Sequence, residues 1–298
     1  GWLDLYVNND VSPNALLRNL GGEGLPGLFD GIAAATGTAD PRGSMGLSVA
    51  DLGLGGGEPD GLPDLFLTHW VAQENALYQA VRGAGGRLEY RDRARDAWLA
   101  EASLPRVGWG SVFADLDRDG AVDLAVANGS TLERGDDPTR LRPEPLFLFW
   151  NDGRGRFHDL AAGAGAAFAA AWDARGLAAA DYDGDGDVDL AVALDRGGVL
   201  LLRNDTATRH RGLAVRLDGP AAAAHGARVE VVAGGRRQVA WAGCDASFLS
   251  GHAPELVFGL GPAAAADRVR VTWADGEETV AGPLAAGRAV LRHPRREP

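Results

Sequence analysis

The sequence predicts an all-β protein in which a partial β-propeller, with blades of about 60 residues, is followed by a small β domain. Two observations carry this prediction. A short apolar phrase that begins with Asp recurs at a nearly constant interval, and its later copies follow acidic, glycine-containing loops. The pattern changes near residue 206, so we expect propeller blades over 1–206 and a separate β domain over 207–298.

The repeated phrase reads as a strand, because it is short and rich in apolar residues. Its copies begin at Asp4, Asp64, Asp123 and Asp189, at intervals of 60, 59 and 66 residues. A second apolar run follows each copy, and in the third unit it leads into a Gly-containing hairpin turn at 151–155. Four short strands per unit favour propeller blades over a solenoid, which is the structural alternative.

The repeated units supply too few complete blades to close a propeller. Residues 1–40 supply the later strands of one blade, 41–105 and 106–172 supply two whole blades, and 175–206 supply most of a fourth. Propellers have about 4–8 blades. We therefore expect an arc of a larger propeller whose N-terminal blades precede this sequence.

The last part of the chain has another pattern. About seven short strands are expected between residues 212 and 291, separated by turns that carry Gly and Pro. Four of them are predicted at 212–217, 227–232, 237–241 and 269–273. No acidic nonapeptide occurs there.

Two complete acidic loops carry the candidate chemistry. In 115–123 and 181–189, carboxylates stand at positions 1, 3, 5 and 9, and Gly stands at position 6, where the backbone must turn sharply. A hard cation such as Ca²⁺ takes about 6–8 oxygen ligands, which these side chains, the carbonyl of position 7 and water can supply. The candidate ligands are Asp115, Asp117, Asp119, Ala121 and Asp123 in the first loop and Asp181, Asp183, Asp185, Asp187 and Asp189 in the second.

An earlier loop is an interrupted copy. Asp51 begins it, Asp60 and Asp64 end it, and residues 53–59 replace and lengthen its middle. These three carboxylates can still converge on a cation if the insertion bulges outward. For all the loops, the alternatives are a solvated acidic turn and an EF-hand. The EF-hand needs a carboxylate at position 12 on a helix, where Val126 and Val192 stand within predicted strands.

Charge and composition exclude several classes of protein. The chain has no Lys, which excludes a Schiff-base lysine and the lysine of a P-loop. The net charge of −12 opposes nucleic-acid binding. The longest apolar stretch, 161–172, is shorter than the roughly 20 residues that cross a bilayer, so no membrane insertion is expected. One cysteine allows no internal disulfide.

The motifs carry a family resemblance. The acidic loops and the Asn-Asp-Gly-x-Gly-x-Phe turn at 151–157 resemble FG-GAP or VCBS-type repeats of integrin-α-like propellers. The end of the chain resembles the ASPIC/UnbV domain of the secreted cartilage acidic protein family and its bacterial relatives, in the stretches 226–229, 247–250, 258–261 and 271–276. The resemblance implies a secreted, calcium-binding, non-catalytic protein. The sequence departs from the family at the interrupted loop and at Ala274, where Pro is usual.

Three functional hypotheses follow. The first is an extracellular or cell-surface scaffold, stabilised by Ca²⁺, that presents loops to a protein or glycan partner. The second is a polysaccharide lyase or sugar dehydratase on the same propeller, with His69 or a Tyr as the base in a cleft. The third is a purely structural domain of a larger assembly. Abundant Ala, Gly and Arg without Lys indicate a GC-rich bacterial genome.

Overall fold

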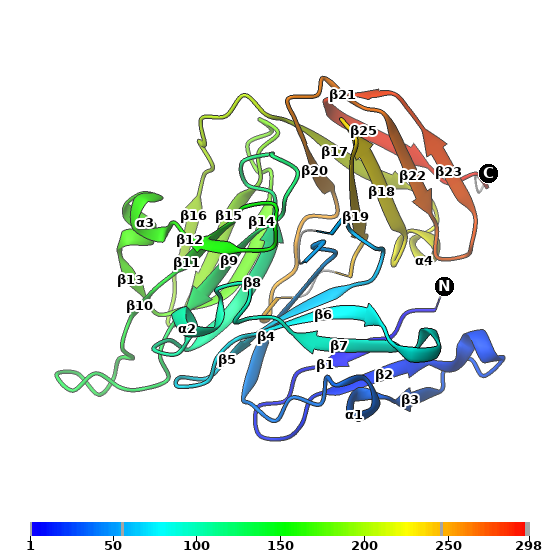
Figure 1. Cartoon of the computed structure of the whole chain (residues 1–298). Coiled ribbons are helices and arrows are strands. Elements are labelled where there is room, and N and C mark those ends of the chain that lie inside the picture. Colours follow the sequence, from blue (N-terminus) through cyan, green and yellow to red (C-terminus); the bar gives the residue numbers. More distant parts are fainter. Residues whose placement is uncertain (1, 55–56, 245–246, 296–298) are drawn as a thin grey trace.

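The computed structural model describes residues 2–54, 57–244 and 247–295 (Figure 1). It is built almost entirely of small antiparallel sheets, which confirms the predicted all-β class. Four of these sheets follow one another along the chain as propeller-like blades, and a C-terminal module of further strands lies at the upper right in Figure 1, above blades 1 and 2.

Blades 1 and 2 come from the first third of the chain. Blade 1 has three strands, in the order β1 (Leu5–Val7), β2 (Ala15–Asn19) and β3 (Phe29–Gly31). Blade 2 has four, in the order β4 (Ser44–Ala50), β5 (Asp64–His69), β6 (Ala76–Arg82) and β7 (Leu88–Asp92). These strands match the predicted partial blade in 1–40 and the whole blade in 41–105.

Blades 3 and 4 repeat the plan. The strands of blade 3 are β8 (Gly108–Ala114), β9 (Asp123–Asn128), β11 (Phe147–Asn151) and β12 (Phe157–Asp159). Those of blade 4 are β14 (Ala174–Ala180), β15 (Asp189–Leu194) and β16 (Val199–Leu202). The second apolar run of the third unit, residues 145–150, is divided, because β10 (Glu144–Pro145) pairs with β13 (Ala171–Trp172) instead of joining blade 3.

The blades stack face to face, with β4 against β8 and β8 against β14. Successive side chains of a strand point to opposite faces. Leu124 and Val126 of β9 therefore enter the core shared with blade 2, while Ala125 and Ala127 enter the core shared with blade 4. This two-sided burial explains why the repeated phrase is an unbroken apolar run rather than an alternating one.

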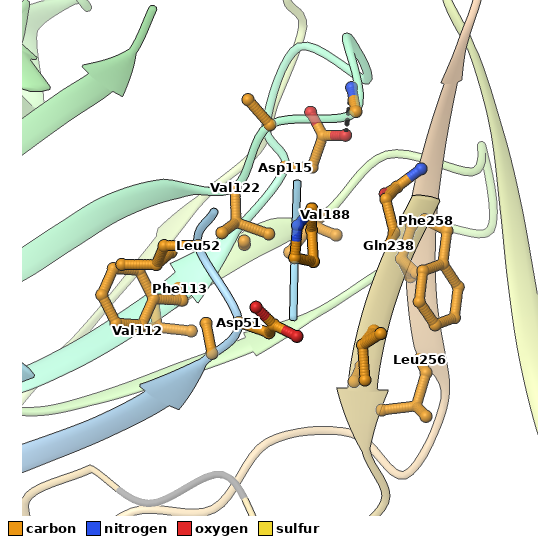
Figure 2. Close-up of a pocket in the computed structure, with 18 of the residues that line it drawn as sticks. Asp51, Leu52, Val112, Phe113, Asp115, Val122, Val188, Gln238, Leu256 and Phe258 are labelled. Carbon is orange, nitrogen blue, oxygen red and sulfur yellow. Dashed lines mark hydrogen bonds between the residues drawn. The ribbon is translucent and has the colours of Figure 1, made fainter. Parts of the chain in front are cut away.

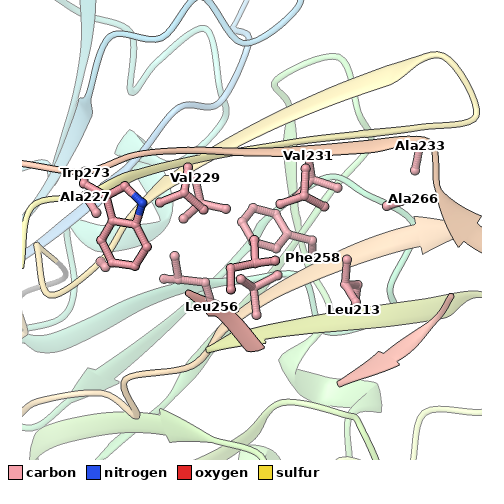
Figure 3. Packing of buried hydrophobic residues seen from close by; sticks show 14 of the residues in the cluster. Leu213, Ala227, Val229, Val231, Ala233, Leu256, Phe258, Ala266 and Trp273 are labelled. Atoms are coloured by element: carbon pink, nitrogen blue, oxygen red, sulfur yellow. The ribbon is translucent and has the colours of Figure 1, made fainter. Parts of the chain in front are cut away.

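The C-terminal module packs two sheets around one core (Figure 3). One sheet has the order β20-β17-β25 and the other the order β19-β18-β22-β23. Phe258 and Leu213 from the first meet Val229 and Val231 from the second, and Trp273 is fully buried at one end of this core. The strands are β17 (Arg211–Asp218), β18 (Arg228–Ala233), β19 (Arg236–Trp241), β20 (Leu256–Gly261), β22 (Arg268–Thr272), β23 (Glu278–Ala281) and β25 (Gly287–Arg292).

A further pair, β21 (Ala265–Ala266) with β24 (Leu284–Ala285), brings the described strands of this module to nine where about seven were expected. Helices are short throughout the described residues. They are α1 (Ala33–Thr36), α2 (Ala100–Ser103), α3 (Ala166–Ala169) and α4 (Ala221–Ala224), with 3₁₀ turns at Leu20–Glu23, Ala84–Gly86 and Ala161–Gly163. None of the helices in this part of the chain has the length and apolar character needed to cross a bilayer.

Candidate metal centre

Each acidic loop closes the hairpin between the first two strands of a blade. The pairing ends at Ala50 opposite Asp64 in blade 2, and at Ala180 opposite Asp189 in blade 4. In blade 3, β8 and β9 end in the same register, so that loop 115–123 spans the open end of their hairpin. The repeat thus places three loops of one design at corresponding ends of three stacked blades.

Loop 115–123 folds its carboxylates inward through local hydrogen bonds. Asp115 Oδ2 accepts the N–H of Gly120 at 2.8 Å, and Asp117 Oδ1 accepts the N–H of Asp119 at 3.0 Å. Gly120 has φ +92°, a backbone conformation that favours glycine and explains this residue at position 6. One oxygen each from Asp115, Asp117 and Asp123 lies within 4.8 Å of the others, so the loop forms a cluster that can hold a metal ion.

Asp123 also fastens the strands together. Its Oδ2 accepts the N–H of Leu116 at 3.0 Å, and its Oδ1 accepts the N–H of Asn151 at 2.9 Å. The Asn151 side chain donates in turn to the Val122 carbonyl at 3.0 Å. Sequence reasoning missed Asn151 as part of the site, although an Asn-Asp pair also follows the last apolar run of blade 4, at residues 204–205.

The electrostatics of this cluster fit a divalent cation. Burial, together with the neighbouring charges of Asp119 and Asp117, raises the pKa of Asp115 to about 8. Burial also raises the pKa of Asp123 to about 8. Asp115 Oδ1 is buried and has no hydrogen-bond partner. Buried polar atoms normally find a partner, and a calcium ion would supply one here while offsetting the repulsion between the carboxylates.

Loop 181–189 repeats the same scaffold. Asp181 Oδ2 accepts the N–H of Gly186, at position 6 of this loop, at 3.1 Å. Asp115 accepts the N–H of Gly120 in the same way in the first loop. Asp189 accepts the N–H groups of Tyr182 at 3.1 Å and Asn204 at 2.7 Å. The oxygens of Asp181, Asp183 and Asp189 form the second cluster within 4.8 Å.

The interrupted loop keeps part of this design. Asp51 accepts the N–H of Gly61 at 2.6 Å, and Asp60 accepts that of Leu62 at 2.9 Å. Asp64 accepts the N–H groups of Leu52 and Ala80, at 3.0 and 2.8 Å. Asp51, Asp60 and Asp64 thus stand at positions 1, 5 and 9, while the insertion replaces position 3. Among the described residues, which leave out residues 55 and 56 of the insertion, these three aspartates do not form a three-carboxylate cluster.

The candidate ligands at position 5 lie outside both clusters. Asp119 Oδ1 instead accepts the N–H of Ala121 at 2.7 Å, and Asp185 Oδ1 accepts that of Asp187 at 3.0 Å. The structure therefore brings positions 1, 3 and 9 together. It uses the position-5 carboxylates to hold the turn that carries position 7.

A cavity of about 330 Å³ lies between the loop ends and the C-terminal module (Figure 2). Asp51 and Asp115 line it from blades 2 and 3, and Gln238, Leu256 and Phe258 line it from the module. The C-terminal module therefore faces one side of the loops across this cavity, an arrangement for which the sequence carries no signal.

His69, the base of the alternative enzyme hypothesis, lies in the interior. Its side chain has no exposed surface, its Nδ1 is 2.8 Å from the Glu74 carbonyl oxygen, and its Nε2 is 3.4 Å from Asp40 Oδ2. A general base must come within hydrogen-bonding distance of its substrate. His69 in this position has a packing and hydrogen-bonding role between blades 1 and 2.

Comparisons with known families agree with the fold. Residues 135–192 match the model of an FG-GAP-like repeat, a range that runs from before β10 into β15 and includes loop 181–189. Residues 218–296 match the model described as ASPIC and UnbV. No curated protein matches the chain. The two matches confirm the resemblance carried by the sequence motifs: the chain combines an FG-GAP-like repeat with a C-terminal ASPIC/UnbV domain.

Proposed function

We propose that this chain is a non-catalytic, extracellular scaffold whose propeller-like blades are stabilised by Ca²⁺ and whose loops bind a protein or glycan partner. FG-GAP-like repeats and ASPIC/UnbV domains are typically non-catalytic, and FG-GAP repeats are typically extracellular, which supports this class of function. We further propose that the propeller region covers 1–206 and the terminal domain 207–298.

The observation that carries the calcium proposal is the pair of carboxylate clusters in loops 115–123 and 181–189. In each, three aspartates stand on a loop whose backbone is held by its own carboxylates, so the ligands are arranged before the ion arrives. All these donors are oxygens, the ligand type that Ca²⁺ prefers. A bound ion would supply positive charge between carboxylates that otherwise repel one another.

The proposed role of Ca²⁺ is to fix each loop between two strands. Asp123 and Asp189 hydrogen-bond to backbone groups in neighbouring strands while belonging to the clusters. A ligand that binds only the folded state adds about 2.7 kcal/mol at 100 times its dissociation constant. Calcium at each loop is therefore expected to raise the melting temperature by about 5–10 °C.

Thermal melts in EDTA and across a calcium titration test this proposal. The variants are Asp117→Asn and Asp183→Asn, alone and combined, because Asn keeps an oxygen that can accept the loop N–H groups while losing the charge. Asp136→Asn is the matched control, since Asp136 is exposed and pairs with Arg134 away from both clusters. We expect the double variant to lose the calcium-dependent rise and the control to keep it.

A folded, metal-free parent protein whose melting temperature does not respond to calcium would contradict the proposal. The acidic loops would then be solvated turns. For the partner, binding to panels of glycans and extracellular proteins should be measured with calcium present, together with turnover of uronate-containing polymers. Turnover would replace the scaffold proposal by the enzyme hypothesis.

A further inference from the structure

The C-terminal module contacts each of the three acidic loops through an arginine. Arg236 Nη1 donates to the Asp119 carbonyl at 3.0 Å, and Arg237 Nη1 donates to the Pro59 carbonyl. Arg288 Nη2 donates to Asp181 Oδ2 at 2.7 Å. One guanidinium from the module thus lies on each loop.

Backbone packing brings the module to this face independently of the arginines. The N–H of Gly261 donates to the Arg118 carbonyl at 2.9 Å, and the N–H of Ala253 donates to the Ala179 carbonyl at 3.0 Å. A Cβ at Gly259 would lie 1.9 Å from Asp115 Oδ2, so the close approach of β20 to loop 115–123 requires glycine. The arginines are therefore held over the loops by a fitted interface.

Among these three contacts, only that of Arg288 involves a carboxylate of a metal cluster. The other two guanidinium groups bind backbone carbonyls. Both oxygens of Asp181 consequently have partners, because its Oδ1 accepts the N–H of Gly184 at 2.7 Å and its Oδ2 accepts from Gly186 and Arg288. The corresponding aspartate of the other loop, Asp115, retains a buried oxygen without a partner.

Strand pairing fixes the position of Arg288. It lies on β25, opposite Ala214 in a parallel pairing with β17, the central strand of the sheet β20-β17-β25. The Asp181 side chain is 3% exposed and that of Arg288 is 53% exposed, so the guanidinium approaches a covered carboxylate from the solvent side. Arg288 is thus a cation tethered to a second domain and placed at a ligand of loop 181–189.

We propose that Arg288 is a built-in counter-ion of loop 181–189 that competes with Ca²⁺ for Asp181, so that calcium at this loop and docking of the C-terminal module oppose each other. This inference rests on the proposed calcium binding of the loops. Coupling between two binding events is reciprocal. If the Arg288 contact weakens calcium binding by a given factor, calcium weakens the contact by the same factor. Calcium bound at the loop therefore loosens the attachment of the module through Arg288.

Terbium luminescence, with Tb³⁺ as the calcium probe and Ca²⁺ as the competitor, measures the affinity of this loop. Tyr182 lies within the loop and can sensitise the ion, and Asp117→Asn in every sample removes the contribution of the other cluster. The test variant is Arg288→Gln. Arg292→Gln is the matched control, because Arg292 is on the same strand and pairs with the exposed Asp218 instead. Arg288→Lys keeps the positive charge.

We expect Arg288→Gln to tighten calcium binding at loop 181–189 about five-fold, the factor that corresponds to the upper end of exposed ion-pair strengths. Arg292→Gln and Arg288→Lys should stay close to the parent. Binding that appears only in Arg288→Gln would also support the inference. Unchanged or weaker binding in Arg288→Gln, or an equal rise in Arg288→Lys, would overturn it.

Failure of this inference is distinguishable from failure of the proposed function. If loop 115–123 binds calcium in the unmodified chain and Arg288→Gln leaves loop 181–189 unchanged, only the competition is wrong. If neither loop binds calcium in the unmodified chain and Arg288→Gln restores none, both the calcium proposal and the competition are wrong.

Discussion

Loops 115–123 and 181–189 share a sequence pattern and a hydrogen-bond scaffold, but they lie in different surroundings. Blade 3 is enclosed between blades 2 and 4, whereas blade 4 leaves Val199 and Leu201 of β16 exposed on the face opposite blade 3. Asp115 and Asp123 are both buried. In the second loop, Asp189 is buried and the side chain of Asp181 is covered, whereas Asp183 is exposed.

Positive charge is distributed in the opposite way. Arg118, which belongs to loop 115–123, reaches across to pair with Asp187, and Arg288 pairs with Asp181. The second loop therefore has two of its carboxylates neutralised by guanidinium groups, while the first has a buried oxygen without a partner. The comparison teaches that the nonapeptide determines the geometry of a loop, and the neighbouring elements determine how strongly that loop needs a cation.

The largest expected difference concerns the aspartate at position 9. Asp123→Ala would leave the N–H groups of Leu116 and Asn151 without their acceptor, and Asn151 is buried. An unsatisfied buried group costs about 1–3 kcal/mol, so the free energy of unfolding should fall by about 2–5 kcal/mol. Denaturant unfolding in EDTA measures this without a contribution from metal.

The matched variant is Asp189→Ala, which releases the N–H groups of Tyr182 and Asn204. Tyr182 is exposed and Asn204 is half-buried, so water can replace the lost acceptor. We expect a loss about half as large. Equal losses in the two variants would show that the position of a blade in the stack does not matter.

A smaller difference is expected in the response to pH. Burial raises the pKa of Asp115 and Asp123 to about 8, against about 3.9 for an unfolded Asp. The folded, metal-free protein therefore binds more protons than the unfolded chain between about pH 4 and pH 8. Its free energy of unfolding should fall as the pH rises through this window, by at most about 1.4 kcal/mol per pH unit for each group.

Calcium should flatten this dependence, because the bound ion keeps the carboxylates deprotonated in the folded state, as they already are in the unfolded chain above about pH 5. Unfolding measured from pH 5 to 8, with EDTA and with saturating calcium, compares the two slopes. Asp115→Asn should flatten the slope in EDTA, and Asp136→Asn, at an exposed position, should not. If the free energy of unfolding of the parent protein in EDTA rises with pH instead of falling, the electrostatics described for loop 115–123 are wrong.

Much of this architecture could be predicted from the sequence, because the repeat is visible in single residues. The phrase beginning at Asp123 forms β9, and the phrase beginning at Asp189 forms β15. The acidic loops were located by their spacing alone, since Asp at alternate positions and Gly at position 6 constrain a local turn. Local geometry of this kind is encoded within nine residues.

The contacts between distant segments could not be predicted in the same way. Arg288 is 107 residues from Asp181, and Arg236 is 117 residues from Asp119. The sequence around an arginine on an amphipathic strand does not indicate which distant carboxylate the side chain will pair with. For the same reason, the insertion at 53–59 left open whether Asp51 and Asp64 would converge, because its path depends on packing rather than on a repeated motif.

The smallest expected difference concerns Trp150, whose Nε1 donates to Asp117 Oδ2 at 3.2 Å. Trp150→Phe keeps a ring of similar character but removes this donor, so the free energy of unfolding should fall by about 1 kcal/mol. Trp172→Phe is the control, since the indole of Trp172 donates to the Ala167 carbonyl outside both loops. Only Trp150→Phe should also change terbium binding at loop 115–123, because the indole orients a carboxylate of that cluster. If both variants lose stability and neither alters ion binding, the indole serves packing alone, and the first loop owes its cation affinity to burial and to Asp115 rather than to Trp150.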